Sequence, residues 1–338
     1  MKNVHISALF FTIVCVVLVS KTISGTDQFI TRKMVRGESV SLVCIEIYGY
    51  YSAELGRAVK SDNPDVIDIN VVSDGQVLRF RKPTHRDTKI ESAASDHSEA
   101  PQGENPFIQK IKATQGVVTY VHGSAGIIPI NDPVTIPLSV NTQLNPGDQI
   151  ITGPDGRVEI IINRESVVRL KENTQMIIEG YRDNRAEEGK TRVNCQNGTI
   201  WTKMKRFRDR LSRFELSLPT AIAGVHGTVY QVSVNSESES EVKVYSGEVA
   251  VRGASPQSTT TPSGEVREIP GPHEVAGPRE VSMEEWTQIV KSMNMVSVGR
   301  DGKPSEQIEF NRDPDDEWEQ WNEDRDRIIA QIIMKGEQ

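Results

Sequence analysis

The sequence predicts a multidomain protein that is mainly β. Residues 33–83 have a compact strand–helix–helix–strand pattern, and residues 106–253 consist of short alternating apolar segments separated by Gly, Asn and Asp turns. Residues 282–338 place apolar side chains at helical spacing. Polar residues 84–105 and the Pro/Ser/Thr/Gly-rich residues 254–281 separate these parts as linkers. We therefore expect a small βααβ module, an all-β domain of stacked short strands, and C-terminal helices.

The N-terminus carries the features of an export signal. Lys2 and His5 precede an apolar run at residues 6–19 that is short for a transmembrane span, and small residues around Gly25 offer a cleavage site. We expect a signal peptide over residues 1–25, with an uncleaved N-terminal anchor as the alternative. The mature protein would then be exported to the periplasm or cell envelope, or secreted, without an integral membrane domain.

Composition narrows the classes of function. The net charge of −8 opposes nucleic acid as a partner, and the mean hydropathy of −0.43 excludes a bulk membrane protein. Beyond the signal, two cysteines remain, Cys44 and Cys195. Export would permit a disulfide, but the two lie in separate predicted domains, which favours two buried free thiols. Neither has a nucleophile-like setting and the histidines are scattered, so we expect no enzyme, no metal site and no cofactor.

The N-terminal module can be followed element by element. Ser39 is an N-cap for a helix over residues 40–48, and Gly49 ends that helix. A second helix covers residues 52–60 and stops before Asn63-Pro64, because the residue before proline avoids the α region. A short alternating apolar strand closes the unit.

Four motifs then stand in order, Gly37-Glu38-Ser39-Val40, Tyr48-Gly49, Asn63-Pro64 and Gly75-Gln76-Val77-Leu78. With them the module resembles the LysM domain, which binds N-acetylglucosamine-containing glycans such as peptidoglycan. The resemblance implies a shallow groove between two loops, whose backbone amides bind the acetamido group of the sugar. The implied glycan-binding residues are Gly37, Glu38, Ser39, Val40, Ser41, Asn63, Pro64, Asp65, Val66 and Ile67. The alternative is that both loops are ordinary turns in a module that does not bind glycan.

A second set of turn motifs occupies residues 106–253. It comprises Gly116-Val117-Val118, Leu144-Asn145-Pro146-Gly147-Asp148, Thr152-Gly153-Pro154-Asp155-Gly156, Gly224-Val225-His226-Gly227-Thr228 and Gly247-Glu248-Val249. This pattern resembles the FecR domain. Two departures are the inverted order of Pro219-Thr220 and His226 at the usual Arg position. The resemblance implies a fold more than an activity, and we expect the glycines to serve turns and close strand packing.

Two segments beyond these motifs allow alternatives. The basic run at residues 203–213 either contacts an anionic polymer or is a solvated excursion between two strands, and we favour the excursion. At the C-terminus, a capping box at Ser282 predicts one helix, and Asp313-Pro314 predicts another. The apolar stripe of the second helix, which includes Trp318, either docks on the β domain, as we favour, or binds a partner.

Together these features predict a non-catalytic exported cell-envelope protein. The LysM-like module would bind peptidoglycan or a related glycan, and the FecR-like domain would be a scaffold or an interaction surface for an envelope protein. The alternative is a periplasmic component of FecR-like signalling without its own cytoplasmic domain, because only a few residues precede the apolar run. FecR proteins relay an outer-membrane signal to a sigma factor. A cell-wall hydrolase is disfavoured, because it needs a Cys–His pair, a zinc set or paired carboxylates in a cleft.

Overall fold

A computed structural model describes residues 28–83, 116–162, 166–181, 190–204, 213–225, 227–253 and 287–333. The expected signal peptide and both expected linkers fall outside these ranges. His226, most of the basic run and the capping box at Ser282 also fall outside them.

The N-terminal module has the predicted βααβ order. Strand β1 (Phe29–Lys33) pairs antiparallel with β2 (Val77–Arg81), and helices α1 (Val40–Tyr48) and α2 (Ala53–Asp62) lie between them in sequence. The Ser39 hydroxyl accepts a hydrogen bond from the Leu42 amide as the N-cap of α1, as expected. Gly49 ends α1 with φ +83°, a left-handed conformation that favours glycine.

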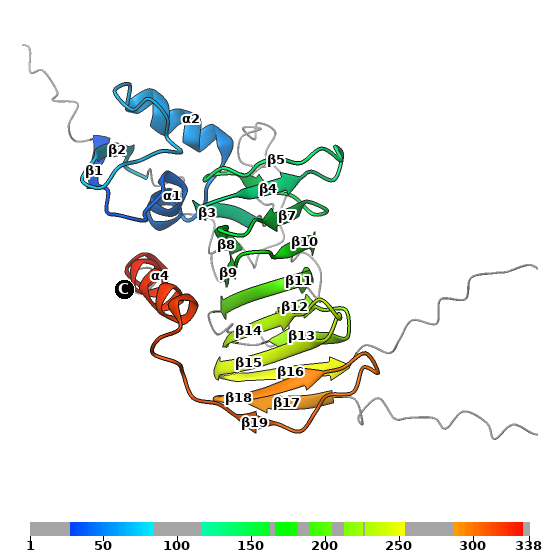
Figure 1. The fold of residues 1–338 in the computed structure, drawn as a ribbon. Coiled ribbons are helices and arrows are strands. Elements are labelled where there is room, and N and C mark those ends of the chain that lie inside the picture. The colour runs from blue at the N-terminus through cyan, green and yellow to red at the C-terminus, as the bar shows by residue number, and fades with distance from the viewer. Residues whose placement is uncertain are drawn as a thin grey trace, which may run out of the picture.

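The β domain is one large sheet that curls into two layers (Figure 1). Its first strands are β3 (Gly116–His122), β4 (Ala125–Ile128), β5 (Ile136–Pro137), β6 (Gln143–Leu144), β7 (Gln149–Thr152), β8 (Arg157–Ile162), β9 (Ser166–Leu170) and β10 (Gln175–Gly180). The later strands are β11 (Lys190–Met204), β12 (Arg213–Ser217), β13 (Ala221–Val225), β14 (Val229–Val234), β15 (Ser240–Ser246), β16 (Glu248–Gly253), β17 (Thr287–Lys291), β18 (Asn294–Val298) and β19 (Ile308–Glu309).

The long strand β11 joins the two layers. Its first half pairs with β10 and β12, and its second half pairs with β9 and β14. Among the described strands, β11–β12 is the parallel pair and the other pairings are antiparallel. The two layers enclose an apolar core that runs the length of the domain, so the mainly β prediction is confirmed.

Period-2 alternation explains how individual strands enter this core. In β14, Tyr230 and Val232 are fully buried, while Val229, Gln231 and Ser233, which alternate with them, are half-buried. At the turn before β16, Gly247 has φ +87°, and a Cβ there would lie 2.6 Å from the Thr228 side chain. This close approach agrees with the expectation that the glycine serves a turn and close strand packing.

The prediction of a helix that begins at Ser282 is wrong for the described residues, which start at 287. Residues 287–298 form a hairpin of β17 and β18, whose turn places Met293 at φ +60°. Val290 and Val296 are buried against the strands of the two layers, while Ile289 stays exposed. Pairing of β17 with β16 and of β18 with β15 therefore overrides the local helical spacing.

The last helix, α4 (Glu317–Ile333), confirms the docking that the sequence favours. The Asp316 carboxylate accepts hydrogen bonds from the Trp318 and Glu319 amides and so caps the first turn. From there α4 runs beside the β domain to the N-terminal module, next to α1 (Figure 1). Ile329 packs in the same apolar cluster as the core of the module.

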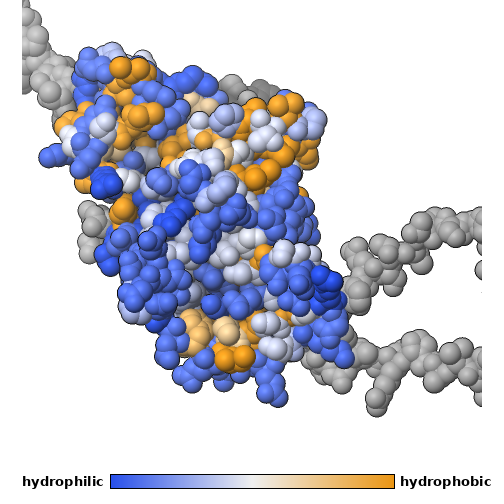
Figure 2. Space-filling view, viewed as in Figure 1, coloured by the Kyte–Doolittle hydropathy of each residue, from blue (hydrophilic) through white to orange (hydrophobic). Residues whose placement is uncertain are grey.

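The outer surface is mostly polar on the face shown in Figure 2, with apolar side chains gathered over the β4–β5 end, over the N-terminal module and near the β18–β19 end. The exposed apolar residues of the β4–β5 end are Ile130, Val134 and Ile136.

Candidate functional site

A cleft of about 250 Å³ opens where the N-terminal module meets the β domain. Residues 37–39, between β1 and α1, form one wall, and residues 69–72, between α2 and β2, form another. Residues 119–121 of β3 form a third wall, and Val140 completes the lining. Two parts of the chain that are distant in sequence therefore share this cleft.

The first wall is held rigidly. Gly37 has φ +86°, and a Cβ there would lie 2.7 Å from a guanidinium nitrogen of Arg325. The Glu38 carboxylate accepts a hydrogen bond from Arg32 Nη2 at 2.6 Å and another from the Val35 amide at 2.9 Å. These contacts fix the backbone of the loop before any ligand arrives.

The second wall is more exposed. The Asn70 amide donates to the Asp68 carboxylate at 2.9 Å, which shapes a tight local turn. Val71 projects from this turn with 71% of its surface exposed. This wall can therefore contact a ligand through an apolar side chain as well as through its backbone.

Asn141 of the β domain ties these two walls together. Its side-chain oxygen accepts a hydrogen bond from the Ser41 amide at 2.8 Å. Its side-chain nitrogen donates to the Ile69 carbonyl at 3.2 Å and to Asn70 Oδ1 at 2.8 Å. The module and the β domain thus meet through specific polar contacts at the edge of the cleft.

The third wall leads directly into a buried charged network. Thr119 donates to Glu159 Oε1 at 2.8 Å, and the Tyr120 ring lies under the Arg325 guanidinium, 4.7 Å from its centroid. Trp321 of α4 packs on the same tyrosine, with ring centroids 5.6 Å apart.

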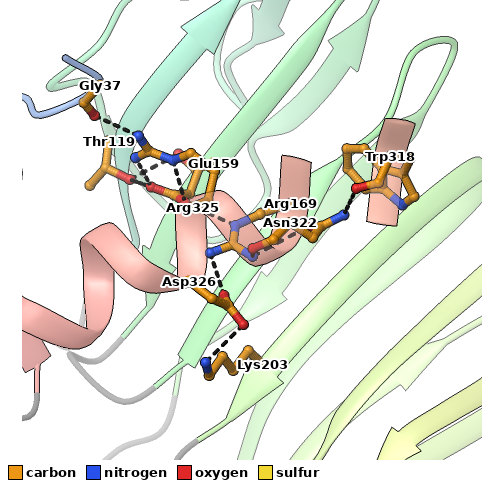
Figure 3. Close-up of polar contacts among 9 residues, drawn as sticks. All are labelled: Gly37, Thr119, Glu159, Arg169, Lys203, Trp318, Asn322, Arg325 and Asp326. Atoms are coloured by element: carbon orange, nitrogen blue, oxygen red, sulfur yellow. Dashed lines mark hydrogen bonds and ion pairs between the residues drawn. The ribbon is translucent and has the colours of Figure 1, made fainter. Parts of the chain in front are cut away.

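Glu159 is the centre of this network (Figure 3). Its side chain and that of Arg169 are both fully buried. Glu159 Oε2 accepts from Arg169 Nε at 2.8 Å and from Arg325 Nε at 3.1 Å, and Oε1 accepts from Arg325 Nη2 at 2.6 Å. Burial by itself would raise the pKa of Glu159, but the guanidinium groups of Arg325 and Arg169 outweigh it and lower the pKa to about 2. The carboxylate is therefore charged at neutral pH.

The same network fastens α4 to the rest of the protein. Arg325 Nη1 donates to the Gly37 carbonyl at 2.6 Å, so one side chain connects the helix, Glu159 and the first wall of the cleft. Asp326 lies 2.7 Å from Arg169 Nη2 and 2.8 Å from Lys203 Nζ. We name the group Glu159, Arg169, Arg325 and Asp326 the charged clamp.

Aromatic side chains seat the start of α4. Trp318 and Trp321 stack with centroids 5.1 Å apart, and Trp318 Nε1 donates to Gln231 Oε1 at 3.0 Å. Tyr245 donates its hydroxyl to the Glu319 carboxylate at 2.6 Å and packs on Trp201. The helix is therefore held by apolar packing at its start and by the charged clamp further along.

Three of the predicted glycan-binding residues, Gly37, Glu38 and Ser39, line the cleft. Val40 and Ser41 follow them in α1 and are buried. In the second predicted loop, the Asn63 side chain instead joins the end of α2 to β2. The remaining residues of that loop, Pro64, Asp65, Val66 and Ile67, are not part of the cleft lining.

Residues 69–72 and 119–121 are the lining segments that the sequence did not indicate. The connection from Asn63-Pro64 to Gly75 carries no pattern that places the first of them at the cleft. No local pattern points to the second, since β3 meets the module through tertiary packing.

Other candidate groups have structural explanations. Cys44 and Cys195 are buried free thiols, as predicted, and burial raises both pKa values, that of Cys195 to about 12. Such thiols are poor nucleophiles. Within the described ranges, no group of three or more His, Cys, Asp and Glu side chains could hold a metal ion. Lys203, the first residue of the basic run, is paired with Asp326.

None of the helices in the described part of the chain has the length and apolar character needed to cross a membrane.

Comparison with known proteins assigns one part of the chain. Residues 148–250 match the family described as FecR protein. A FecR domain is therefore supported over residues 148–250 alone. The match covers less than a third of the 338 residues but includes Glu159, Arg169 and the strands from β7 to the first half of β16. It confirms the FecR resemblance over these residues, whereas nothing in the comparisons supports the LysM resemblance of residues 33–83.

Similarity to solved structures is weak. Two crystal structures described as a "putative anti-sigma factor" from Parabacteroides distasonis ATCC 8503, at 1.65 and 2.50 Å resolution, match with 16% sequence identity and a TM-score of 0.32. Each match covers 49% of this chain and 60% of that chain. A TM-score of 0.32 is too low to define a shared fold. No curated protein matches the chain.

Proposed function

We propose that the protein is an exported, non-catalytic component of cell-envelope signalling, in which the FecR domain passes a change at the cleft to a protein partner. One observation carries this proposal: Arg325 bonds both the Gly37 carbonyl at the cleft and Glu159 inside the FecR domain. The family match supports signalling more than it supports glycan binding, because it falls on the FecR domain.

The contacts suggest how the cleft and the FecR domain are coupled. A ligand between residues 37–39 and β3 changes the position of the Gly37 carbonyl, and with it the bond from Arg325. Because Arg325 belongs to α4, that change alters the free energy of docking the helix on the FecR domain. A ligand that binds the docked and undocked arrangements with different affinity shifts their populations, and a partner can detect the exposed surface.

Deletion of the gene in its native host tests this proposal. We expect transcripts that depend on an extracytoplasmic sigma factor to change and to return to normal with the wild-type gene. Arg325→Gln should fail to restore them while still being exported and folded, as judged by fractionation and circular dichroism. A matched control is Arg300→Gln, which removes an exposed arginine far from the cleft. Transcript levels that do not change on deletion, or that Arg325→Gln restores fully, would contradict the proposal.

Glycan binding at the cleft is a second candidate, supported by the lining that Gly37, Glu38 and Ser39 provide. Residues 69–72 add an exposed apolar side chain, Val71, which can contact the acetamido methyl group. The partner would be peptidoglycan or a related N-acetylglucosamine glycan.

Co-sedimentation of the mature chain with insoluble peptidoglycan tests the second candidate. Val71→Asp places a charge in the cleft, and Ile67→Asp places one on the same loop outside the lining; Ile67 is 96% exposed, so neither change disturbs the core. We expect Val71→Asp to reduce pelleting several-fold and Ile67→Asp to leave it unchanged. The opposite result would move the sugar to the loop that the sequence predicted, and an absence of pelleting by the wild type would remove this candidate.

A further inference from the structure

The carboxamide of Asn141 occupies a position between the two loops of the N-terminal module. Its oxygen accepts from the Ser41 amide, and its nitrogen donates to the Ile69 carbonyl and to Asn70 Oδ1. Both its side-chain oxygen and its side-chain nitrogen are therefore hydrogen-bonded to the module, and the residue is 8% exposed. Its neighbour Val140 lines the cleft, so the turn that carries the carboxamide lies beside that cavity.

The groups that hold this carboxamide also suit an acetamido group. An acetamido group has one carbonyl oxygen, which needs a donor, and one N–H, which needs an acceptor. The Ser41 amide offers the donor and the Ile69 carbonyl offers the acceptor, in the spacing that a single amide can bridge. Ser41, which lies in the first turn of α1, is also among the residues for which the LysM resemblance implies glycan binding.

The β domain presents Asn141 in a fixed conformation. Asn141 has φ +68°, which asparagine tolerates better than most residues, and its amide donates to the Val118 carbonyl at 2.8 Å. The Val118 amide in turn donates to the Thr142 carbonyl at 2.9 Å. This short turn between β5 and β6, bonded to β3, therefore presents the carboxamide to the module.

We propose that Asn141 is an internal ligand that fills an acetamido subsite of the N-terminal module, so that N-acetylated sugars must compete with it. The proposal rests on the glycan-binding candidate and adds its control: the closed form binds sugar poorly, and the open form binds it well. The apparent affinity is then reduced by the fraction of molecules in which Asn141 has left the subsite.

A substitution that keeps the turn but removes the carboxamide tests this proposal. Asn141→Gly does so, because glycine adopts positive φ readily. Asn173→Gly is a matched control: Asn173 is also an asparagine at positive φ in the β domain, φ +55°, and its backbone bonds with Gly153 and Asn197 lie within that domain. The probe is tetra-N-acetylchitotetraose, titrated into the full mature chain by calorimetry.

We expect Asn141→Gly to bind the tetrasaccharide about tenfold more tightly than the wild type, since a competing set of hydrogen bonds has been removed. Asn173→Gly should bind as the wild type does. In parallel, hydrogen exchange at the Ser41 amide should accelerate in Asn141→Gly alone and slow again when the sugar is added.

The possible results separate the two proposals. Binding by the wild type without a gain in Asn141→Gly overturns the internal ligand and leaves glycan binding intact. Tighter binding by Asn141→Gly than by the wild type supports the internal ligand. If no form binds the tetrasaccharide, the internal ligand and glycan binding are both overturned, while the signalling proposal is unaffected.

Discussion

The interior of the β domain and the junction around α4 are stabilised in different ways. The main core cluster consists of apolar side chains from alternating positions of the strands. The junction instead buries Glu159 and Arg169 completely and relies on the charged clamp together with a few aromatic rings. The stability of an apolar core does not depend on the charge of its side chains. The stability of a buried ion network depends on every member being present and charged. The junction is therefore the part that a ligand, a mutation or acid can release.

Removal of one member of the charged clamp should have the largest effect. Glu159→Gln leaves two buried guanidinium groups without their carboxylate, so we expect a loss of about 3–5 kcal/mol in the free energy of unfolding. Urea denaturation measures it, with Glu237→Gln as the control, because Glu237 is an exposed carboxylate whose pairing with Arg300 is loose. Equal stability of the two variants would contradict a clamp that holds α4.

Acid should weaken the same junction. The pKa of Glu159 lies below its usual value of 4.5, at about 2, so its charge stabilises the fold above pH 4.5 and this contribution disappears as the pH falls through 2. The contribution lost is on the order of 3 kcal/mol. Stability measured from pH 6 to pH 2 should fall more steeply in the wild type than in Glu159→Gln, which lacks the titrating group. Parallel curves would show that this carboxylate does not carry the pH dependence.

A conservative change in the apolar core should be smaller and independent of pH. Ile160, next to Glu159 on β8, is fully buried. Ile160→Val removes one methylene and should reduce the free energy of unfolding by about 1 kcal/mol. Its effect should be the same at pH 4 and pH 7 in denaturation experiments, which would distinguish packing at this site from the charged clamp one residue away.

The smallest effect should come from a surface pair. Arg57 and Glu54 lie 3.2 Å apart on α2, and both side chains are more than half exposed. Arg57→Gln should change the free energy of unfolding by less than about 0.5 kcal/mol. A larger loss of unfolding free energy would mean that this surface ion pair stabilises the module more than an exposed pair is expected to.

The same contrast explains how much the sequence could predict. Alternation in segments such as β14 predicted the β domain, and Ser39 and Gly49 predicted the ends of α1, because those signals are local. The helix prediction for residues 287–298 was wrong, because their pairing with distant strands outweighed the local helical spacing.

The site was less predictable than the fold. The loop at residues 37–39 was indicated by its motif, but Glu159 and Arg325 are 166 positions apart and carry no shared local pattern. Asn141 stood out no more than other asparagines in turns. Its position against the module depends on how β3 packs, which a single sequence does not reveal.

The proposed coupling of the cleft to the FecR domain runs through Arg325 and Glu159. Hydrogen exchange followed by mass spectrometry at pH 7 tests it most directly, on the wild type, Glu159→Gln and Glu237→Gln. We predict that Glu159→Gln accelerates exchange both in α4 and at the start of α1, beside Gly37, while Glu237→Gln changes neither. Faster exchange in α4 with unchanged exchange in α1 would contradict the proposed coupling, because the helix would then be released without any effect reaching the cleft.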